Sequence, residues 1–306
     1  MSDHLLILCR QFAIFDATFY ALFSFNAGLP LAEIEKKIEG VKEAIENSHS
    51  SVASLRLLPF LQLVSNLMGR SEDPRLLDGD IVKHEDVMRA TAKKTNKPIE
   101  VWNHFDQVSM FMKGLTVEVI AQLNSSAYFK ELCAYLFGDF ELAARSGKVA
   151  RRLFGVYHPG IDIANIALID GLTSLELYRQ GKNKRFHILN ARKHLKRLKK
   201  VAYKTPQNCL GKYYLLHAQL LATTTTDREK TSVKFVASIA LFDQSDLTME
   251  RGLSNCLFAS FLESNQEQEA ARSHFQLAAS IYDGWGAVAL VDHLSKTHSR
   301  YFPQRM

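Results

Sequence analysis

The sequence predicts an all-α fold in which antiparallel helix pairs stack into an irregular solenoid. Two observations lead to this prediction. The 306 residues include only 7 prolines and 15 glycines, and so few chain breakers favour long helices over a β-sandwich with many tight turns. Apolar residues mostly recur at steps of three and four, which is the spacing of one helix face, and no stretch alternates convincingly as a half-buried strand does.

Short turns divide the chain into segments of about 12–20 residues, a usual helix length, so that roughly fourteen helices are expected. The expected turns lie at 28–30, 47–51, 69–80, 157–160, 181–183 and 205–208. The longest irregular stretch is the loop 70–82, and no low-complexity linker divides the chain. We therefore expect one helical body over 1–306, with its weaker part at 1–70 and its clearest repeat at 249–300.

The apolar N-terminus is expected to form an amphipathic helix. Asp3 and His4 stand where a signal peptide carries basic residues, and Arg10, Gln11 and Asp16 interrupt the apolar run. The four cysteines lie far apart and form no C-x-x-C pair, which fits a reducing compartment. These features predict a cytoplasmic protein without a membrane span.

The positive charge is concentrated in one segment. The net charge is +6, and residues 177–226 contain 12 Lys and Arg and no acidic residue. Within the helix expected at 184–204, an apolar stripe passes through Ile188, Leu195 and Leu198. The cations on the opposite face are Arg192, Lys193, Lys196, Arg197 and Lys200.

Two interpretations of this basic face are open. It is either a site for a nucleic acid, an acidic protein tail or a membrane surface, or a solvated face whose charge is balanced by acidic residues of neighbouring helices. No aromatic residue is interleaved with the cations, which disfavours a platform for stacking single-stranded bases. Charge runs are more often solvated faces, so the second interpretation is favoured.

Small and aromatic residues near the C-terminus suggest repeated helix pairs. Ala271, Phe275, Ala278 and Tyr282 follow one another at steps of four, three and four, and a further stripe is expected after Gly284. Small residues allow two helices to approach closely, and aromatic side chains fill the space beside them. The residues expected in such packing are Gly138, Ala143, Ala271, Phe275, Ala278, Tyr282, Trp285, Gly286 and Ala287. This pattern is similar to the tetratricopeptide repeat, with its clearest unit at 249–300.

Seven short motifs, in order, resemble one family of helical regions. They are GLPL at 28–31, QLVSNLMGRSEDPRLLDG at 62–79, FGDFELA at 137–143, IDGLTSL at 169–175, TPQNCLGKYYLLHAQ at 205–219, ERGLSNCLFASFLES at 250–264 and AARSHFQLAASIYDGWGAVALVDHL at 270–294. The chain from about 20 to 300 thereby resembles the tetratricopeptide-like C-terminal region of large signalling proteins. Those proteins carry a protein-kinase-like segment and a STAND-type AAA ATPase, and often a histidine kinase or nucleotide cyclase.

The resemblance implies a helical module without chemistry of its own. The ATPase and output modules have no counterpart in this sequence, which implies a lone module or a fragment of a longer protein. His217 and Gln219 stand where acidic residues are common in the family, and Ile169 stands where Tyr is common.

Motifs for catalysis and metal binding are missing from the sequence. It contains no G-x-x-x-x-G-K-[ST], no G-x-G-x-x-G and no G-x-S-x-G. Gly147-Lys148 is not part of a phosphate loop, because Leu142 replaces the first glycine and Val149 the hydroxyl residue. His187 and His194 are seven residues apart, but they lie within the basic segment, which disfavours a bound cation. We therefore expect no catalytic, cofactor or metal residues.

The function expected from these features is noncovalent. The preferred hypothesis is a scaffold or sensor module of a signalling assembly that binds a protein or peptide, for instance an ATPase or output module, in a concave groove. One alternative is anion or nucleic-acid binding through 184–204. The other is small-molecule sensing in the groove of the solenoid.

Overall fold

The computed structural model describes residues 3–46, 52–83, 89, 117–153 and 160–302, and within these ranges the fold is all-α, as predicted. It contains no strand in this part of the chain. The helices are α1 (Asp3–Asn26), α2 (Leu31–Glu46), α3 (Val52–Leu67), α6 (Val117–Leu136), α7 (Phe140–Leu153), α8 (Gly160–Arg179), α9 (Lys184–Lys204), α10 (Pro206–Thr224), α11 (Arg228–Asp243), α12 (Thr248–Ser264), α13 (Gln268–Trp285), α14 (Val288–Thr297) and the 3-10 turn η2 (Ser299–Tyr301). The turns expected at 47–51 and 157–159 fall outside the described residues.

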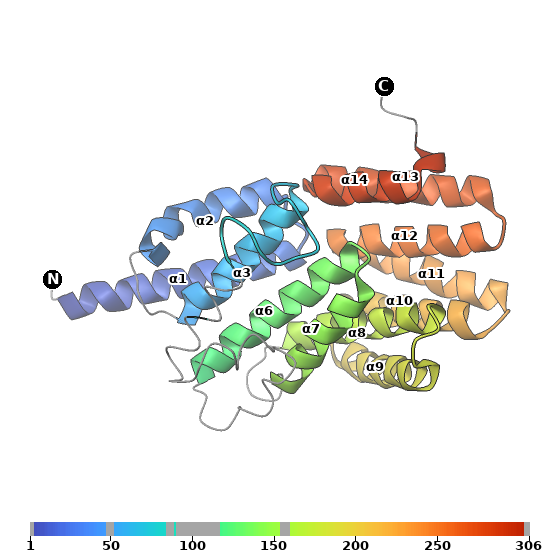
Figure 1. Ribbon diagram of the computed structural model, residues 1–306, viewed down its shortest axis with the longest axis horizontal. Helices are drawn as coiled ribbons and strands as arrows, with labels where there is room; N and C mark the ends of the chain where they lie inside the picture. Colours follow the sequence, from blue (N-terminus) through green and yellow to red (C-terminus); the bar gives the residue numbers. More distant parts are fainter. Residues whose placement is uncertain (1–2, 47–51, 84–88, 90–116, 154–159, 303–306) are drawn as a thin grey trace.

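Neighbouring helices pack against one another along the chain (Figure 1). The helices α6, α8, α10 and α12 form a row, in which α6 contacts α8, α8 contacts α10 and α10 contacts α12. The helices α7, α9 and α11 each lie between two members of this row in sequence and contact both. None of the described helices is long and apolar enough to cross a bilayer.

Local sequence signals set the helix boundaries. Gly138 adopts a positive φ of 82° between α6 and α7, and the side chain of Asp139 accepts a hydrogen bond of 3.0 Å from the backbone N–H of Leu142. Asp227 caps α11 in the same way. At the end of α13 the sequence suggested a break after Gly284, but the helix continues to Trp285 and ends at Gly286, whose φ is 87°.

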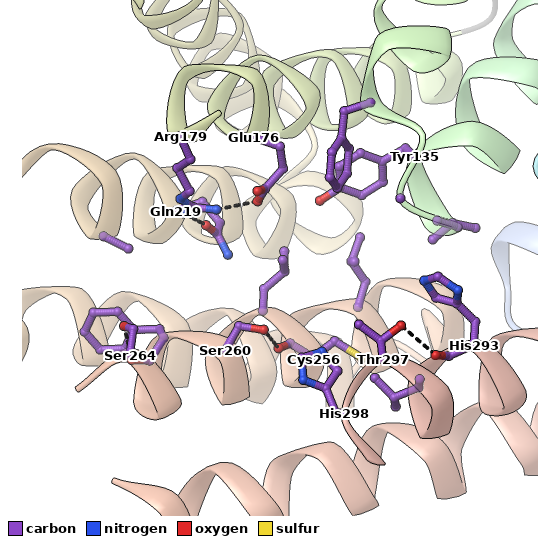
Figure 2. Close-up of a pocket in the computed structure, with 18 of the residues that line it drawn as sticks. Tyr135, Glu176, Arg179, Gln219, Cys256, Ser260, Ser264, His293, Thr297 and His298 are labelled. Carbon is purple, nitrogen blue, oxygen red and sulfur yellow. Dashed lines mark hydrogen bonds and ion pairs between the residues drawn. The ribbon is translucent and has the colours of Figure 1, made fainter. Parts of the chain in front are cut away.

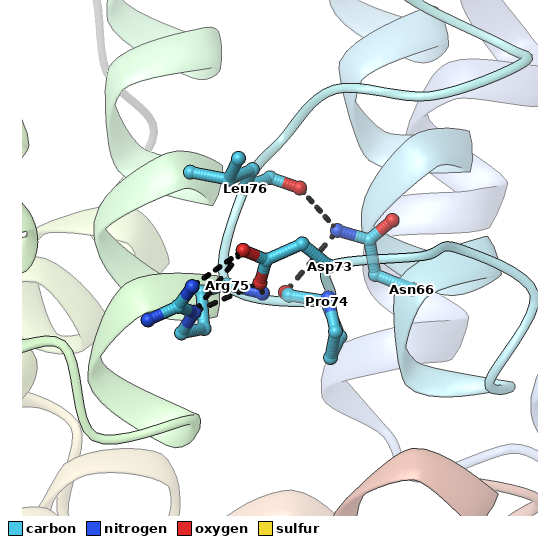
Figure 3. Close-up of polar contacts among 5 residues, drawn as sticks. All are labelled: Asn66, Asp73, Pro74, Arg75 and Leu76. Atoms are coloured by element: carbon cyan, nitrogen blue, oxygen red, sulfur yellow. Dashed lines mark hydrogen bonds and ion pairs between the residues drawn. The ribbon is translucent and has the colours of Figure 1, made fainter.

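Two buried amides, Gln62 and Asn66, hold the irregular loop 70–82 in place, and Figure 3 shows the contacts of Asn66 with this loop. Gln62 and Asn66 lie one turn apart on α3, and the Gln62 amide donates to Asn66 Oδ1 at 2.8 Å. Asn66 then donates to the carbonyl of Leu76 at 2.6 Å, while Gln62 accepts from the backbone N–H of Val82 at 3.1 Å. Side chains thus satisfy the backbone groups of a segment that has no regular structure.

Helices from the N-terminal and C-terminal parts of the chain are in contact, which an open solenoid would not require. The turn between α1 and α2 receives a hydrogen bond of 2.9 Å from the indole N–H of Trp285 to the carbonyl of Leu29. Thr248, at the start of α12, donates to the carbonyl of Gly28 at 3.2 Å. Helix α14 packs against α3, as the upper ends of these helices in Figure 1 show. The two ends of the sequence therefore close the body on itself.

Candidate functional site

The helices surround a cavity of about 590 Å³ (Figure 2). One wall belongs to α6, α8 and α10 and carries Tyr135, Glu176, Arg179 and Gln219. The facing wall belongs to α12 and α14 and carries polar side chains interspersed with leucines; the polar ones are Cys256, Ser260, Ser264, His293, Thr297 and His298. The cavity is thus assembled from residues more than a hundred positions apart in the sequence.

The first wall offers hydrogen-bond donors. The Arg179 guanidinium pairs with Glu176 one turn earlier on α8 and donates to the side-chain oxygen of Gln219 on α10. Because Gln219 uses its oxygen for this bond, its amide nitrogen remains to face the cavity (Figure 2). Burial raises the pKa of Glu176, and the neighbouring Arg179 partly opposes that rise. The corner is therefore a fixed group of N–H donors next to a partly buried carboxyl.

The second wall offers acceptors. The hydroxyls of Ser260, Ser264 and Thr297 donate to backbone carbonyls of their own helices, at 3.1, 2.7 and 2.8 Å. Each hydroxyl donates its single proton in that bond, and the lone pairs of its oxygen can accept a hydrogen bond from a further partner. A ligand that donates toward α12 and α14 and accepts from α8 and α10 would match both walls.

The other polar groups of the lining are uncharged at neutral pH. Burial raises the pKa of the Cys256 thiol to about 12, so the nucleophilic thiolate is not formed. Burial also raises the pKa of Tyr282 well above its ordinary value and lowers the pKa of His293 and His298. The lining is suited to hydrogen bonding and apolar contact.

A second polar cluster lies where α6, α7, α8 and α9 meet, outside the cavity. Arg151 pairs with the buried Asp170, and His194 Nε2 lies 3.8 Å from Asp170 Oδ2. Glu131 is completely buried beside them, and both of its oxygens lack a hydrogen-bond partner in the described structure. A side chain at Gly147 would lie within 3 Å of carboxylate oxygens of both Glu131 and Asp170.

These surroundings shift the pKa values of the cluster in opposite directions. Burial raises the pKa of Glu131 to about 8, against the opposing effect of Arg151. Burial and then the nearby cations, Arg151 first, lower the pKa of His194 to about 3. Both side chains are therefore largely neutral at pH 7. In the sequence, His194 drew notice only as a metal ligand and Asp170 only as part of the motif at 169–175, and Glu131 carried no signal.

The five basic residues singled out in the sequence lie on α9, away from the cavity, and none lines it. Ala191, His194, Leu198 and Ala202 form the buried face of α9, and the cations occupy the other side. Ion pairs with acidic neighbours, expected for a balanced solvated face, are not found for Arg192, Lys193, Lys196 or Lys200 among the described residues.

The residues singled out for repeat packing are mostly in the core. Seven are buried: Ala143, Ala271, Phe275, Ala278, Tyr282, Trp285 and Ala287. Gly138 is exposed at the α6–α7 turn, and Gly286 caps α13. Two of the nine, Gly138 and Tyr282, also line the cavity, so that packing residues and candidate binding residues overlap.

Most of the cavity residues were not identified from the sequence. Gln219 was noted only because it departs from the family pattern, and it carries the clearest signal, a buried amide within the apolar run LLHAQLLA. Glu176 and Arg179 look like an ordinary pair of helix charges, and Ser260 like an ordinary helix serine. Their common place in the lining of the cavity appears only when α8, α10 and α12 are brought together.

A metal centre is not formed by the described residues, which contain no group of three or more His, Cys, Asp or Glu side chains arranged to hold a metal ion. The likeness to signalling proteins rests on the motifs quoted above. What the cavity binds has to be argued from its geometry, since comparisons of the chain with protein-family models, with curated proteins and with solved structures give no match.

Proposed function

We propose that this protein is a noncovalent recognition module that binds a short, extended segment of a partner protein in the central cavity. The observation that carries the proposal is the pair of polar walls, with donors at Arg179 and Gln219 and acceptors at Ser260 and Thr297. An extended chain presents N–H and C=O groups along both of its edges, and its side chains point to the two remaining sides. Two facing walls that carry polar groups match the edges of such a chain, and the leucines of the α12–α14 wall would contact its apolar side chains.

The size of the cavity supports binding of a short segment rather than of a folded domain. Ligand sites commonly occupy about 300–1,000 Å³, and the cavity measures about 590 Å³. Its apolar lining includes Leu253, Leu257, Leu290 and Leu294, which would contact one or two apolar side chains of the segment. The rest of the partner would remain outside.

The wider interpretation is a scaffold or sensor in a signalling assembly. Its support is the order of the seven sequence motifs together with the succession of packed helix pairs, which is typical of tetratricopeptide-like solenoids. In such solenoids one helix of each pair lines a concave surface. The row of α6, α8, α10 and α12 would be that lining series, and the cavity would be its deepest part.

Two serine substitutions test the proposal. Ser260 lies in the cavity and Ser273 on the exposed side of α13, and both hydroxyls donate to the carbonyl four residues earlier, at 3.1 and 3.0 Å. Ser260→Trp should fill the cavity, whereas Ser273→Trp adds the same side chain to the solvent side. Peptides selected from a random library on the native chain should bind Ser273→Trp unchanged and Ser260→Trp at least about tenfold more weakly. Equal affinity for both variants would refute binding in the cavity.

Sensing of a small molecule in the same cavity is the second candidate. It is favoured by the fixed corner of Arg179, Glu176 and Gln219, which would orient a compact polar ligand. A metabolite panel in a thermal-shift assay separates the candidates, because a ligand that binds the native state raises the apparent melting temperature. A shift that Ser260→Trp abolishes, without selection of any peptide, would favour the small molecule.

A further inference from the structure

The outer face of α9 combines exposed cations with exposed apolar side chains. Phe186 is 53% exposed, Leu189 55% and Tyr203 91%. The stripe from Phe186 through Leu189, Lys193, Lys196 and Lys200 to Tyr203 advances by steps of three and four, so that all six side chains lie on one side of the helix. No aromatic residue lies between the lysines of this stripe, but Phe186 and Tyr203 lie at its two ends.

Among the described residues, no ion pair with an acidic neighbour is found for Lys193, Lys196 or Lys200, the cations of this stripe. Three of the twelve cations of 177–226 have partners elsewhere, since Arg179 pairs with Glu176, Lys182 with Glu141 and the buried Lys212 with Glu250. Nine of the twelve belong to α9, namely Lys184, Arg185, Arg192, Lys193, Lys196, Arg197, Lys199, Lys200 and Lys204, and of these Arg197 has an interaction partner. Eight of these are exposed, and only Arg197 is half-buried.

The positive surface continues from α9 over α10 to α11. Lys234 of α11 lies with its ammonium nitrogen 4.9 Å from the ring centre of Tyr214 on α10. Burial lowers the pKa of His217 on α10, and the cations Lys234, Lys230 and Lys199 lower it further. Val233, one turn after Lys230 on α11, is 56% exposed and adds an apolar group to this region.

From these observations we propose that the α9 face docks onto the surface of a bilayer that contains anionic phospholipids. The lysines would lie among the negatively charged headgroups, and Phe186, Leu189 and Tyr203 would enter the interface between headgroups and acyl chains. Phe186 and Tyr203 stand about 25 Å apart along the helix axis, which spreads the contact over several headgroups. The face is separate from the central cavity, so the proposal does not depend on what the cavity binds.

Two features favour a lipid surface over a nucleic acid or an acidic protein. Six of the nine cations are lysines, whose ammonium groups act as compact point charges, whereas bidentate recognition of phosphates and bases relies mainly on arginine. Transfer of the large apolar side chains at both ends of the stripe from water into the membrane interface is favourable, whereas a polyphosphate backbone would leave them in water. An acidic helix of a partner protein would need a groove to receive it, and no α9 residue lines the cavity described above.

The test compares binding of the full chain to phosphatidylcholine vesicles with and without phosphatidylserine, measured by sedimentation at low ionic strength. The native chain should bind the anionic vesicles and not the neutral ones. The combined variant Lys193→Glu, Lys196→Glu and Lys200→Glu should lose at least about one hundredfold in affinity, since each lysine contributes roughly fivefold. The control Lys36→Glu, Lys37→Glu and Lys148→Glu makes the same change of net charge at exposed positions outside α9 and should lose much less.

A second variant tests the apolar contribution at unchanged charge. Phe186→Ser, Leu189→Ser and Tyr203→Ser together should weaken vesicle binding several-fold, because these side chains enter the interface. The docking proposal is overturned if the native chain does not bind anionic vesicles at low salt. It is also overturned if this variant binds them as well as the native chain does, or if single-stranded nucleic acid competes fully for the site; either result would identify a purely electrostatic polyanion patch.

Discussion

Two buried side chains, Glu131 and His194, lie beside Asp170, and they make the stability of the protein depend on pH in opposite directions. Burial raises the pKa of Glu131 to about 8, so the native state keeps a proton that the unfolded chain releases near pH 4.5. The free energy of unfolding is therefore reduced as the pH rises from about 4.5 to 8, by up to about 1.4 kcal/mol per pH unit. The pKa of His194 is lowered to about 3, so the unfolded chain takes up a proton there before the native state does. Its contribution therefore reduces the free energy of unfolding as the pH falls from 6.5 toward 3.

Glu131→Gln should therefore gain stability relative to the native chain as the pH rises. The amide keeps the neutral shape and has no proton to lose, so the difference in unfolding free energy between variant and native chain should grow from about pH 4.5 to 8 and then level off. Urea unfolding at a series of pH values measures it. The exposed Glu269→Gln is the control and should show little pH-dependent difference. A difference for Glu131→Gln that does not change with pH would contradict the assignment of a buried neutral acid.

The ion pair between Lys212 and Glu250 is the other buried charge site, and it joins α10 to α12. The ammonium nitrogen lies 2.6 Å from Glu250 Oε1, and both side chains are only 2% exposed. Removal of one partner leaves the other charge buried and unpaired, which costs about 3–5 kcal/mol. We expect losses of that order for Lys212→Met and for Glu250→Leu, and a much smaller loss for the double variant. Additive losses in chemical denaturation would mean that the two charges do not stabilise each other.

At the scale of helices, the sequence predicted the elements well because their signals are local. The turn within the motif at 137–143 ends where Asp139 caps α7, and the spacing of Ile188, Leu195 and Leu198 identifies the inner side of α9, whereas most of the turn expected at 205–208 belongs to α10, which begins at Pro206. Contacts between helices are not local, and they were predicted less well. The buried Asp170 and Glu131 occupy ordinary helix positions in the sequence, and only the meeting of α6, α7, α8 and α9 brings them together.

Close approach of α12 and α13 depends on Gly252. A Cβ atom there would lie 2.3 Å from the ring of Tyr282, whereas one at Gly284 on α13 would meet nothing within 4 Å. Gly252→Ala should therefore destabilise the protein by about 1–3 kcal/mol through overpacking. Gly284→Ala should be neutral or stabilise it by up to about 1 kcal/mol, because alanine favours the helix. If thermal unfolding places the two variants at the same melting temperature, the helices are not packed this closely.

At the scale of the whole molecule, α3 and the turn between α1 and α2 contact α12, α13 and α14, so that N-terminal and C-terminal helices pack together. The sequence predicts stacked helices and a groove, but it contains no local signal for this closure of the body. Trp285 and Gly28 look like ordinary packing and turn residues, and nothing in their local sequence indicates a partner more than two hundred positions away. The cavity could not be predicted for the same reason.

The closure can be tested at Gly28, with Gly138 as the matched control. Both glycines have a positive φ, 70° and 82°, and alanine is strained at both by about 1–2 kcal/mol. A Cβ at Gly28 would also lie 2.3 Å from the backbone oxygen of Asp246, whereas one at Gly138 meets nothing within 4 Å. Gly28→Ala should thus cost about 1–3 kcal/mol more than Gly138→Ala in urea unfolding. Equal losses would show that the α1–α2 turn does not pack against the start of α12.

The central claim is that the proposed partner segment binds in the cavity, and photo-crosslinking tests this position most directly. A benzophenone side chain at Ser264, on the exposed rim of the cavity, is compared with one at Ser273 on the outer side of α13, each with a peptide selected on the native chain. We predict covalent adducts at Ser264 and none at Ser273. Adducts at Ser273, or no adduct at Ser264 while the peptide still binds, would place the partner outside the cavity and contradict the account.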